Sequence, residues 1–204
     1  MPFSDRLARL RTPGRNRARL PFPAAPGLRV AQMAPRATFD AVEAFAFHRW
    51  HAVEAFRPQV LVGPALALHM LAVRVQEKTL DLSSVDHAIF VTSECGVSTL
   101  TDTARVVLWQ AFGVPVYELF TDGQGQLLGS ECEMHDGWHV EPHVKLETAG
   151  GEVLLPLPSR QSGPLRLAAK IETSVCACGR AGARILPAER KPAARAGRTL
   201  AATA

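Results

Sequence analysis

The chain has 204 residues, 47% of them hydrophobic, and a formal net charge of +4. This length accommodates one domain with a hydrophobic core, with or without tails. No run of 18 uncharged apolar residues occurs, so we expect no membrane span. Residues 1–26 contain arginines but not the apolar segment of a secretory signal, so we expect a cytoplasmic protein.

The positive charge is concentrated at the two ends of the chain. Counting Lys, Arg, Asp and Glu, residues 1–40 carry +6 and residues 180–204 carry +5, whereas residues 41–179 carry −7. An acidic centre argues against a nucleic-acid-binding face there. We expect residues 1–38 and 187–204 to be basic, mostly disordered tails around a domain at 39–186. Solvated tails are the preferred interpretation, and contact with RNA or anionic lipid is the alternative.

Between these tails the apolar pattern alternates between helix and strand. Helical spacing predicts helices over residues 39–56, 64–77 and about 101–112, the last with Thr101 or Asp102 as its cap and Gly113 as its end. Short apolar runs predict strands over 59–62, 87–92 and 114–118, and a β-rich part from about 126 with strands over 127–132, 138–140, 144–148, 152–157 and 165–171. This order predicts an α/β layer with an appended β extension.

The strongest local signal for chemistry is the run Cys176-Ala177-Cys178-Gly179-Arg180. Two thiols two residues apart, followed by glycine, are typical of a tight metal knuckle, because the glycine lets backbone amides approach a thiolate sulfur. Tetrahedral zinc needs two more ligands. The alternative is that these are ordinary buried or exposed cysteines, since C-x-C is weaker evidence than paired C-x2-C.

The stretch from Ser130 to His139 contains candidates for the remaining ligands. Cys132 would supply a third thiolate. We favour His139 as the fourth ligand because Gly137 allows a turn before a returning strand, with His135 second and His143 third. Such a closed Cys3His site would be structural, joining two distant β segments and contributing folding free energy.

Several motifs between Phe56 and Ile185 resemble, in order and spacing, the phenylacetate–coenzyme A ligase family of adenylate-forming enzymes. They are Arg57-Pro58-Gln59-Val60-Leu61-Val62-Gly63-Pro64, Phe90-Val91-Thr92-Ser93-Glu94, Ala111-Phe112-Gly113-Val114-Pro115-Val116-Tyr117, Ser130-Glu131-Cys132-Glu133 with Gly137-Trp138-His139-Val140, and Cys176-Ala177-Cys178-Gly179-Arg180. The resemblance implies part of the large α/β domain of such a ligase, with a zinc-stapled β extension. It also implies zinc on these thiols and the histidine.

The resemblance further implies an adenylation activity, for which the chain lacks several parts. These ligases activate a carboxylate with ATP and Mg2+ and pass the acyl group to coenzyme A. Residues 1–56 contain nothing like the family's phosphate loop, and the 24 residues after Arg180 contain no lysine-bearing domain. Gln124 stands where the family has a magnesium-binding glutamate, and a neutral amide binds a hard cation less well than a carboxylate does.

A remnant nucleotide pocket is the second expected site. Carried over from the family motifs, it comprises Ser93, Glu94, Phe120, Thr121, Gly123, Gln124, Gly125 and Glu172. Glu172 falls at the position of an aspartate that contacts the ribose hydroxyls, but Leu167 and Ile171 replace the arginine and glycine of that motif.

We therefore expect a truncated, ligase-like protein without independent adenylation activity, acting as a binding or vestigial module. One part of a split carboxylate–coenzyme A ligase, completed by a partner chain, is the alternative. A second copy of the chain, bound through exposed apolar surface, is the other expected partner.

Overall fold

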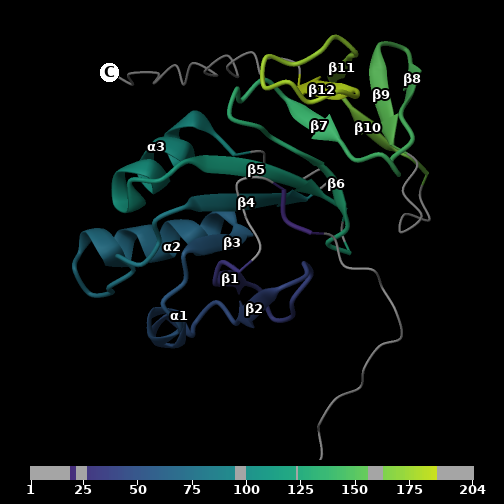
Figure 1. Ribbon diagram of the computed structural model, residues 1–204. Coiled ribbons are helices and arrows are strands. Elements are labelled where there is room, and N and C mark those ends of the chain that lie inside the picture. Colours follow the sequence, from purple (N-terminus) through teal and green to yellow (C-terminus); the bar gives the residue numbers. More distant parts are fainter. Residues whose placement is uncertain (1–18, 22–26, 95–99, 123, 156–162, 188–204) are drawn as a thin grey trace, which may run out of the picture.

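The computed structural model describes residues 19–21, 27–94, 100–122, 124–155 and 163–187 (Figure 1). Its helices are α1 (Trp50–Phe56), α2 (Ala65–Gln76) and α3 (Asp102–Phe112). Its strands are β1 (Val30–Met33), β2 (Val42–Phe45), β3 (Val60–Pro64), β4 (Ala88–Glu94), β5 (Val116–Thr121), β6 (Leu127–Ser130), β7 (Trp138–Val140), β8 (Glu147–Ala149), β9 (Glu152–Leu155), β10 (Leu165–Leu167), β11 (Ala169–Glu172) and β12 (Arg184–Pro187). Among these residues no helix is long and apolar enough to cross a membrane.

A nine-stranded mixed sheet, in the order β11-β12-β7-β6-β5-β4-β3-β1-β2, organises the molecule. The strands from β2 to β5 pair in parallel, and the pairs from β5/β6 to β11/β12 are antiparallel. A second, three-stranded sheet, β10-β9-β8, packs against the antiparallel half through a shared apolar cluster. The sheet therefore has a parallel half and an antiparallel half that meet at β5.

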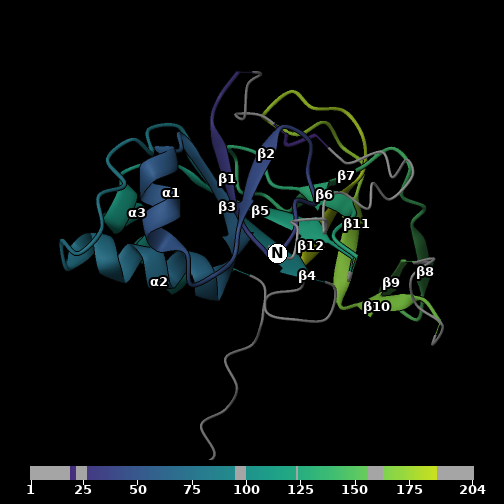
Figure 2. The same cartoon turned by 90° about the horizontal axis from the view of Figure 1, so that it is seen from below.

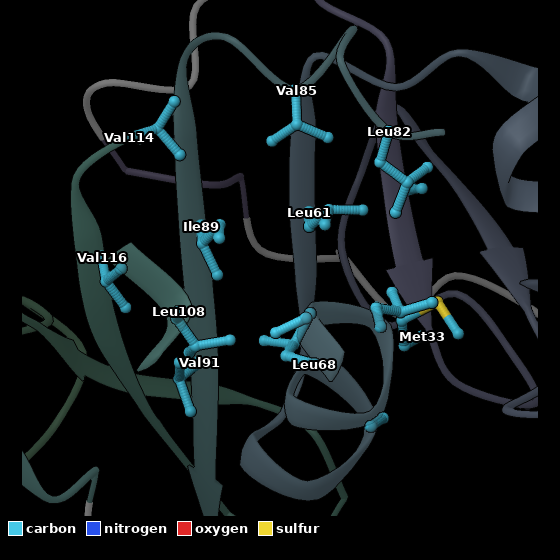
Figure 3. Packing of buried hydrophobic residues seen from close by; sticks show 14 of the residues in the cluster. Met33, Leu61, Leu68, Leu82, Val85, Ile89, Val91, Leu108, Val114 and Val116 are labelled. Carbon is cyan, nitrogen blue, oxygen red and sulfur yellow. The ribbon is translucent and has the colours of Figure 1, made fainter. Parts of the chain in front are cut away.

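The helices all pack on one face of the parallel half, as Figure 2 shows from below. Strand residues alternate between faces, so Ile89 and Val91 point toward the helices while Phe90, between them, points to the other face. Leu68 of α2 and Leu108 of α3 pack onto this face within the cluster drawn in Figure 3. On the opposite face the buried cluster includes Phe39, from the β1–β2 connection, together with Val30, Val60, Val62, Ala88, Phe90, Tyr117, Leu119 and Leu127.

Most elements of the α/β layer confirm the sequence predictions. The hydroxyl of Thr101 accepts a hydrogen bond from the Ala104 amide at 3.2 Å, which caps α3. Gly113 ends that helix in the left-handed conformation, with φ +69°. Helix α2 begins after Pro64 and ends within two residues of the predicted boundary.

Three predictions were wrong. The expected basic tail over residues 1–38 contains β1, a strand between β2 and β3 whose four residues are all buried. The single helix expected over 39–56 is instead β2 followed by the short helix α1, because pairing of β2 with β1 overrides the helical spacing. The single strand expected over 165–171 is two strands in different sheets, and β12, at the boundary of the expected tail from 187, was not predicted.

Candidate metal centre and ligand groove

Four predicted metal ligands converge in the antiparallel half of the sheet. Cys132 follows β6, His139 lies on β7, and Cys176 and Cys178 lie in the loop between β11 and β12. Their donor atoms all lie within 4.8 Å of one another. All but Cys178 are buried.

Two of the donor–donor distances match those around a tetrahedral ion. The sulfur atoms of Cys132 and Cys176 are 3.8 Å apart, and Sγ of Cys178 is 3.4 Å from Nε2 of His139. Zinc–sulfur bonds of ~2.3 Å and zinc–nitrogen bonds of ~2.0 Å at tetrahedral angles place two sulfurs about 3.8 Å apart and a sulfur and a nitrogen about 3.5 Å apart. Three thiols and an imidazole with this spacing can hold a Zn2+ ion.

The local backbone explains how these ligands are presented. The amide of Gly179 donates to the Cys176 carbonyl at 2.8 Å, and the amide of Arg180 donates to the Cys178 sulfur at 3.4 Å. Gly179 has φ +82°, a conformation that favours glycine. The predicted approach of a backbone amide to the thiol at this knuckle is therefore present.

Gly137 turns the chain so that β7 can begin. It has φ +76°, and a Cβ there would lie 2.5 Å from the carbonyl oxygen of Ile185. The requirement for glycine is thus both conformational and steric. As predicted, this turn brings His139 back along the sheet, where it pairs with Ser130 on one side and Arg184 on the other.

The other two histidine candidates are not in the donor cluster. His135 stacks on Tyr117 with ring centroids 5.6 Å apart, and its Nδ1 lies 3.2 Å from a guanidinium nitrogen of Arg105. Nδ1 of His135 is also 3.5 Å from the carboxylate of Glu131. His143 likewise lies outside the cluster, so the structure brings only His139 to the three cysteines.

Burial and neighbouring charges shift the pKa values of the donors. Burial raises the pKa of the Cys132 thiol to about 11, so a metal must displace a proton there. Burial, followed by the charges of Arg180 and Arg184, lowers the pKa of His139 and favours the neutral imidazole that binds metals. The pKa of Cys176 is lowered, mainly by the hydrogen bond from the Cys178 amide.

A groove of about 550 Å3 opens at the carboxyl ends of the parallel strands. It lies where the strand order reverses: β2 is on one side of β1 and β3 is on the other. Crevices at such reversals are the usual ligand sites of open α/β sheets. The described lining residues are Gln32, Met33, Ala34, Pro35, Arg36, Thr38, Phe47, Gly63, Pro64, Ala65, Leu66, Thr92, Thr121, Gln124 and Gly125.

Three of the predicted nucleotide-pocket residues line this groove, namely Thr121, Gln124 and Gly125. The β5–β6 loop, which carries Gln124 and Gly125, packs against the β1–β2 connection, since a Cβ on Gly125 would lie 2.8 Å from Cγ2 of Thr38. Thr38 is itself held by Gln32, whose side-chain amide donates to its hydroxyl at 2.6 Å and accepts from its backbone amide at 2.9 Å. The groove is therefore built partly from the segment that the sequence assigned to a tail.

The remaining pocket residues are placed differently. Ser93 and Glu94 pair with Phe120 and Thr121 across β4 and β5, but the Ser93 hydroxyl donates to the buried carboxyl of Glu118. The Phe120 ring stacks on Trp138 in the cluster beneath the small sheet, with centroids 4.9 Å apart.

Of the two further predicted positions, Glu172 lies away from the groove. Glu172 lies on the edge strand β11, four strands from β5, and its carboxylate accepts from the Ser174 amide at 2.8 Å. Gly123 lies outside the described residues. Asp122, two residues before Gln124, is buried, and its carboxylate accepts from the amides of Gln124 and Gln126 at 2.8 Å each.

Sequence reasoning missed a buried polar network that links β4 and β5 to the segment that precedes Cys132. The carboxyl group of Glu118 accepts from the Leu100 amide at 2.9 Å and from the Trp138 indole at 3.1 Å, in addition to Ser93. The Glu118 amide in turn donates to the carboxylate of Glu131, the residue before Cys132, at 2.8 Å. The signal in the sequence that could have identified this network is Glu118, a charged residue inside the apolar run Val116–Phe120.

Comparison with solved structures identifies the fold. The chain is similar to 2-hydroxyisobutyryl-CoA ligase in complex with 2-HIB-AMP and CoA, with a TM-score of 0.59 and 15% identity over 80% of this chain and 44% of the ligase. It is also similar to VinN, with a TM-score of 0.52 and 10% identity over 79% of this chain and 50% of VinN. A variant of coronafacic acid ligase from Pectobacterium brasiliense gives a TM-score of 0.50 and 12% identity, over 83% of this chain and 40% of that ligase.

No protein-family model matches the chain, and no curated protein matches it in sequence. The structural similarity nevertheless shows that the α/β fold corresponds to part of the fold of adenylate-forming CoA ligases. The chain spans about 44% of the length of 2-hydroxyisobutyryl-CoA ligase.

Proposed function

We propose that this chain is a ligand-binding module with the fold of an adenylate-forming CoA ligase, and that it does not adenylate a carboxylate by itself. The observation that carries the proposal is the groove at the β1–β3 reversal, which contains Gln124 and no carboxylate side chain among its described lining residues. Magnesium prefers carboxylate and phosphate oxygens, so a groove with an amide at this position favours binding over adenylation chemistry.

The described lining of the groove indicates an anionic ligand with an apolar part. Arg36 is the only charged side chain among the described lining residues, and the hydroxyl-bearing residues Thr38, Thr92 and Thr121 lie around the same space. Met33, Phe47 and Leu66 supply an apolar wall. An acyl group linked to a carboxylate or phosphate matches this combination. The similar 2-hydroxyisobutyryl-CoA ligase was solved with 2-HIB-AMP and CoA, which supports this ligand class.

Titration calorimetry with AMP, with coenzyme A and with short-chain carboxylates tests binding, and carboxylate-dependent ATP–pyrophosphate exchange tests adenylation. We expect saturable binding of at least one ligand, weakened about tenfold by Arg36→Gln, and no exchange. Arg29→Gln is the matched control, because Arg29 is exposed and precedes β1 at the end away from the groove. Pyrophosphate exchange by this chain alone would overturn the proposal, as would equal binding by Arg36→Gln and the unchanged protein.

The second candidate function is that of one chain of a two-chain carboxylate–CoA ligase. The observation in its favour is that the fold matches 44% of the 2-hydroxyisobutyryl-CoA ligase chain. Under this alternative, pyrophosphate exchange appears only when a second chain is added, and Gln124→Glu increases it by restoring a carboxylate for magnesium.

We also propose that Cys132, His139, Cys176 and Cys178 bind a structural Zn2+ ion. The mutual distances of their donor atoms support this. All four tetrahedral positions would be filled by protein ligands, so the ion would stabilise the fold and would not take part in catalysis.

A further inference from the structure

Arg184 is a buried cation beside the proposed metal centre. It is the first residue of β12 and lies directly opposite His139 of β7, with only 5% of its surface exposed. A guanidinium is costly to remove from water unless anionic or hydrogen-bonding groups compensate for the lost hydration. The buried guanidinium of Arg184 therefore requires such partners in the folded state.

The hydrogen bonds of Arg184 connect the two segments that carry the metal ligands. One guanidinium nitrogen donates to the carboxylate of Asp136 and, at 3.3 Å, to its backbone carbonyl. Asp136 lies between Cys132 and His139 in the sequence. The other terminal nitrogen donates to the hydroxyl of Ser174, two residues before Cys176, at 3.4 Å. Arg184 thus holds together the same two loops that the ion would join.

The charge of Arg184 also matches what the centre would need. A Zn2+ ion with three thiolates and a neutral imidazole carries a net charge of −1, and a buried net charge is unfavourable unless it is compensated. Arg184 lies directly opposite His139, the proposed nitrogen ligand, and its guanidinium reaches Ser174, two residues before the proposed ligand Cys176. The Asp136 side chain is 58% exposed, so water screens its charge and Arg184 is only partly neutralised.

One donor of Arg184 remains unused. Its Nε is buried and has no hydrogen-bond partner among the described residues. A buried donor without an acceptor costs ~1–3 kcal/mol. A negatively charged metal–thiolate group beside it would lower this cost electrostatically.

We propose that Arg184 is a positioning residue of the metal centre: it clamps the two ligand-bearing loops and balances the negative charge of the metal–thiolate group. The inference rests on the proposed zinc site. Removal of Arg184 is expected to weaken metal binding without removing any ligand.

The test compares the full chain with Arg184→Gln, Arg184→Lys and Arg166→Gln. Zinc affinity is measured by competition with a chromophoric chelator, and Co2+ is substituted to record the sulfur-to-cobalt charge-transfer band. Arg184→Gln should bind zinc about 10- to 100-fold more weakly, the usual effect of losing a residue that supports metal ligands. Its charge-transfer band should move to lower energy, because the thiolate electrons lose a stabilising positive charge.

The other two variants separate charge from position. Arg184→Lys should recover part of the affinity, since lysine restores the charge but not the planar fork. Arg166→Gln removes the same charge from exposed Arg166 on β10, which pairs with Glu152, and should leave affinity and spectrum unchanged. Equal affinity and an unshifted band in Arg184→Gln would overturn the inference. If Arg184→Gln does not fold, the comparison rests on Arg184→Lys. A zinc affinity and a charge-transfer band in Arg184→Lys equal to those of the unchanged protein would then reject the role of Arg184. If the unchanged protein binds no zinc, the proposed metal centre itself fails.

Discussion

The sulfur atoms of Cys132 and Cys176 lie 3.8 Å apart, although 44 positions separate the two residues in the sequence. This proximity leads to the first prediction, that the purified chain contains about one zinc ion. Cys176→Ser and His139→Ala should each lose most of it, because a closed site needs all four ligands. Metal content by mass spectrometry checks this. His143→Ala is the matched control, since His143 lies outside the donor cluster, and zinc loss in that variant would contradict the assignment of the fourth ligand.

The second prediction concerns the turn before β7. Gly137→Ala should destabilise the fold by about 2 kcal/mol or more, because it combines left-handed strain with the overlap on the Ile185 carbonyl. Chemical denaturation measures the change in the free energy of unfolding. Gly150→Ala has a similar positive φ, +61°, with nothing within 4 Å of the added Cβ, so it should cost only about 1 kcal/mol. Equal costs at the two positions would show that the steric contact is unimportant.

The third prediction concerns the pH dependence of stability at Glu118. Burial raises the pKa of its carboxyl above its ordinary value of 4.5, so the native state binds a proton that the unfolded state has lost. This stabilisation is complete below pH 4.5 and disappears as the pH rises through the folded-state pKa. Glu118→Gln should remove this part of the pH dependence while changing stability at low pH by only ~1 kcal/mol.

Denaturation curves from pH 4 to 8 test the Glu118 prediction. The control is Glu152→Gln, which makes the same change at an exposed carboxylate paired with Arg166. If the free energy of unfolding of Glu118→Gln still declines above pH 4.5 as in the unchanged protein, groups other than Glu118 cause the decline.

The fourth prediction tests β1 as part of the core. Met33→Ala should destabilise the protein by about 2–5 kcal/mol, because Met33 is fully buried under the helices. Leu66→Ala removes a comparable apolar side chain that is 72% exposed and should change stability by less than ~1 kcal/mol. Thermal unfolding of the two variants distinguishes a core strand from a dispensable tail: a Met33→Ala midpoint equal to that of the unchanged protein would contradict the placement of β1.

The sequence alone determined the features that depend on neighbouring residues. Helix α3 was predicted with its Thr101 cap and Gly113 end, because a cap hydrogen bond and a left-handed glycine are local. The same holds for the Cys176–Gly179 knuckle and for the turn at Gly137. These patterns, together with motif order, also identified the part of the chain with a ligase-like α/β layer, which the similarity to solved structures confirms at the level of the fold.

Tertiary structure decided what depends on pairing between distant segments. Residues 42–45 have helical spacing in the sequence, yet they form β2 because β1 offers a parallel edge. Strand β1 was not predicted because it lies in a segment rich in arginine. Sheet order likewise placed Arg184 opposite His139 and Glu172 far from the groove. The physical reason is that strand hydrogen bonds and buried charges are satisfied by partners many residues away, so no local pattern specifies them.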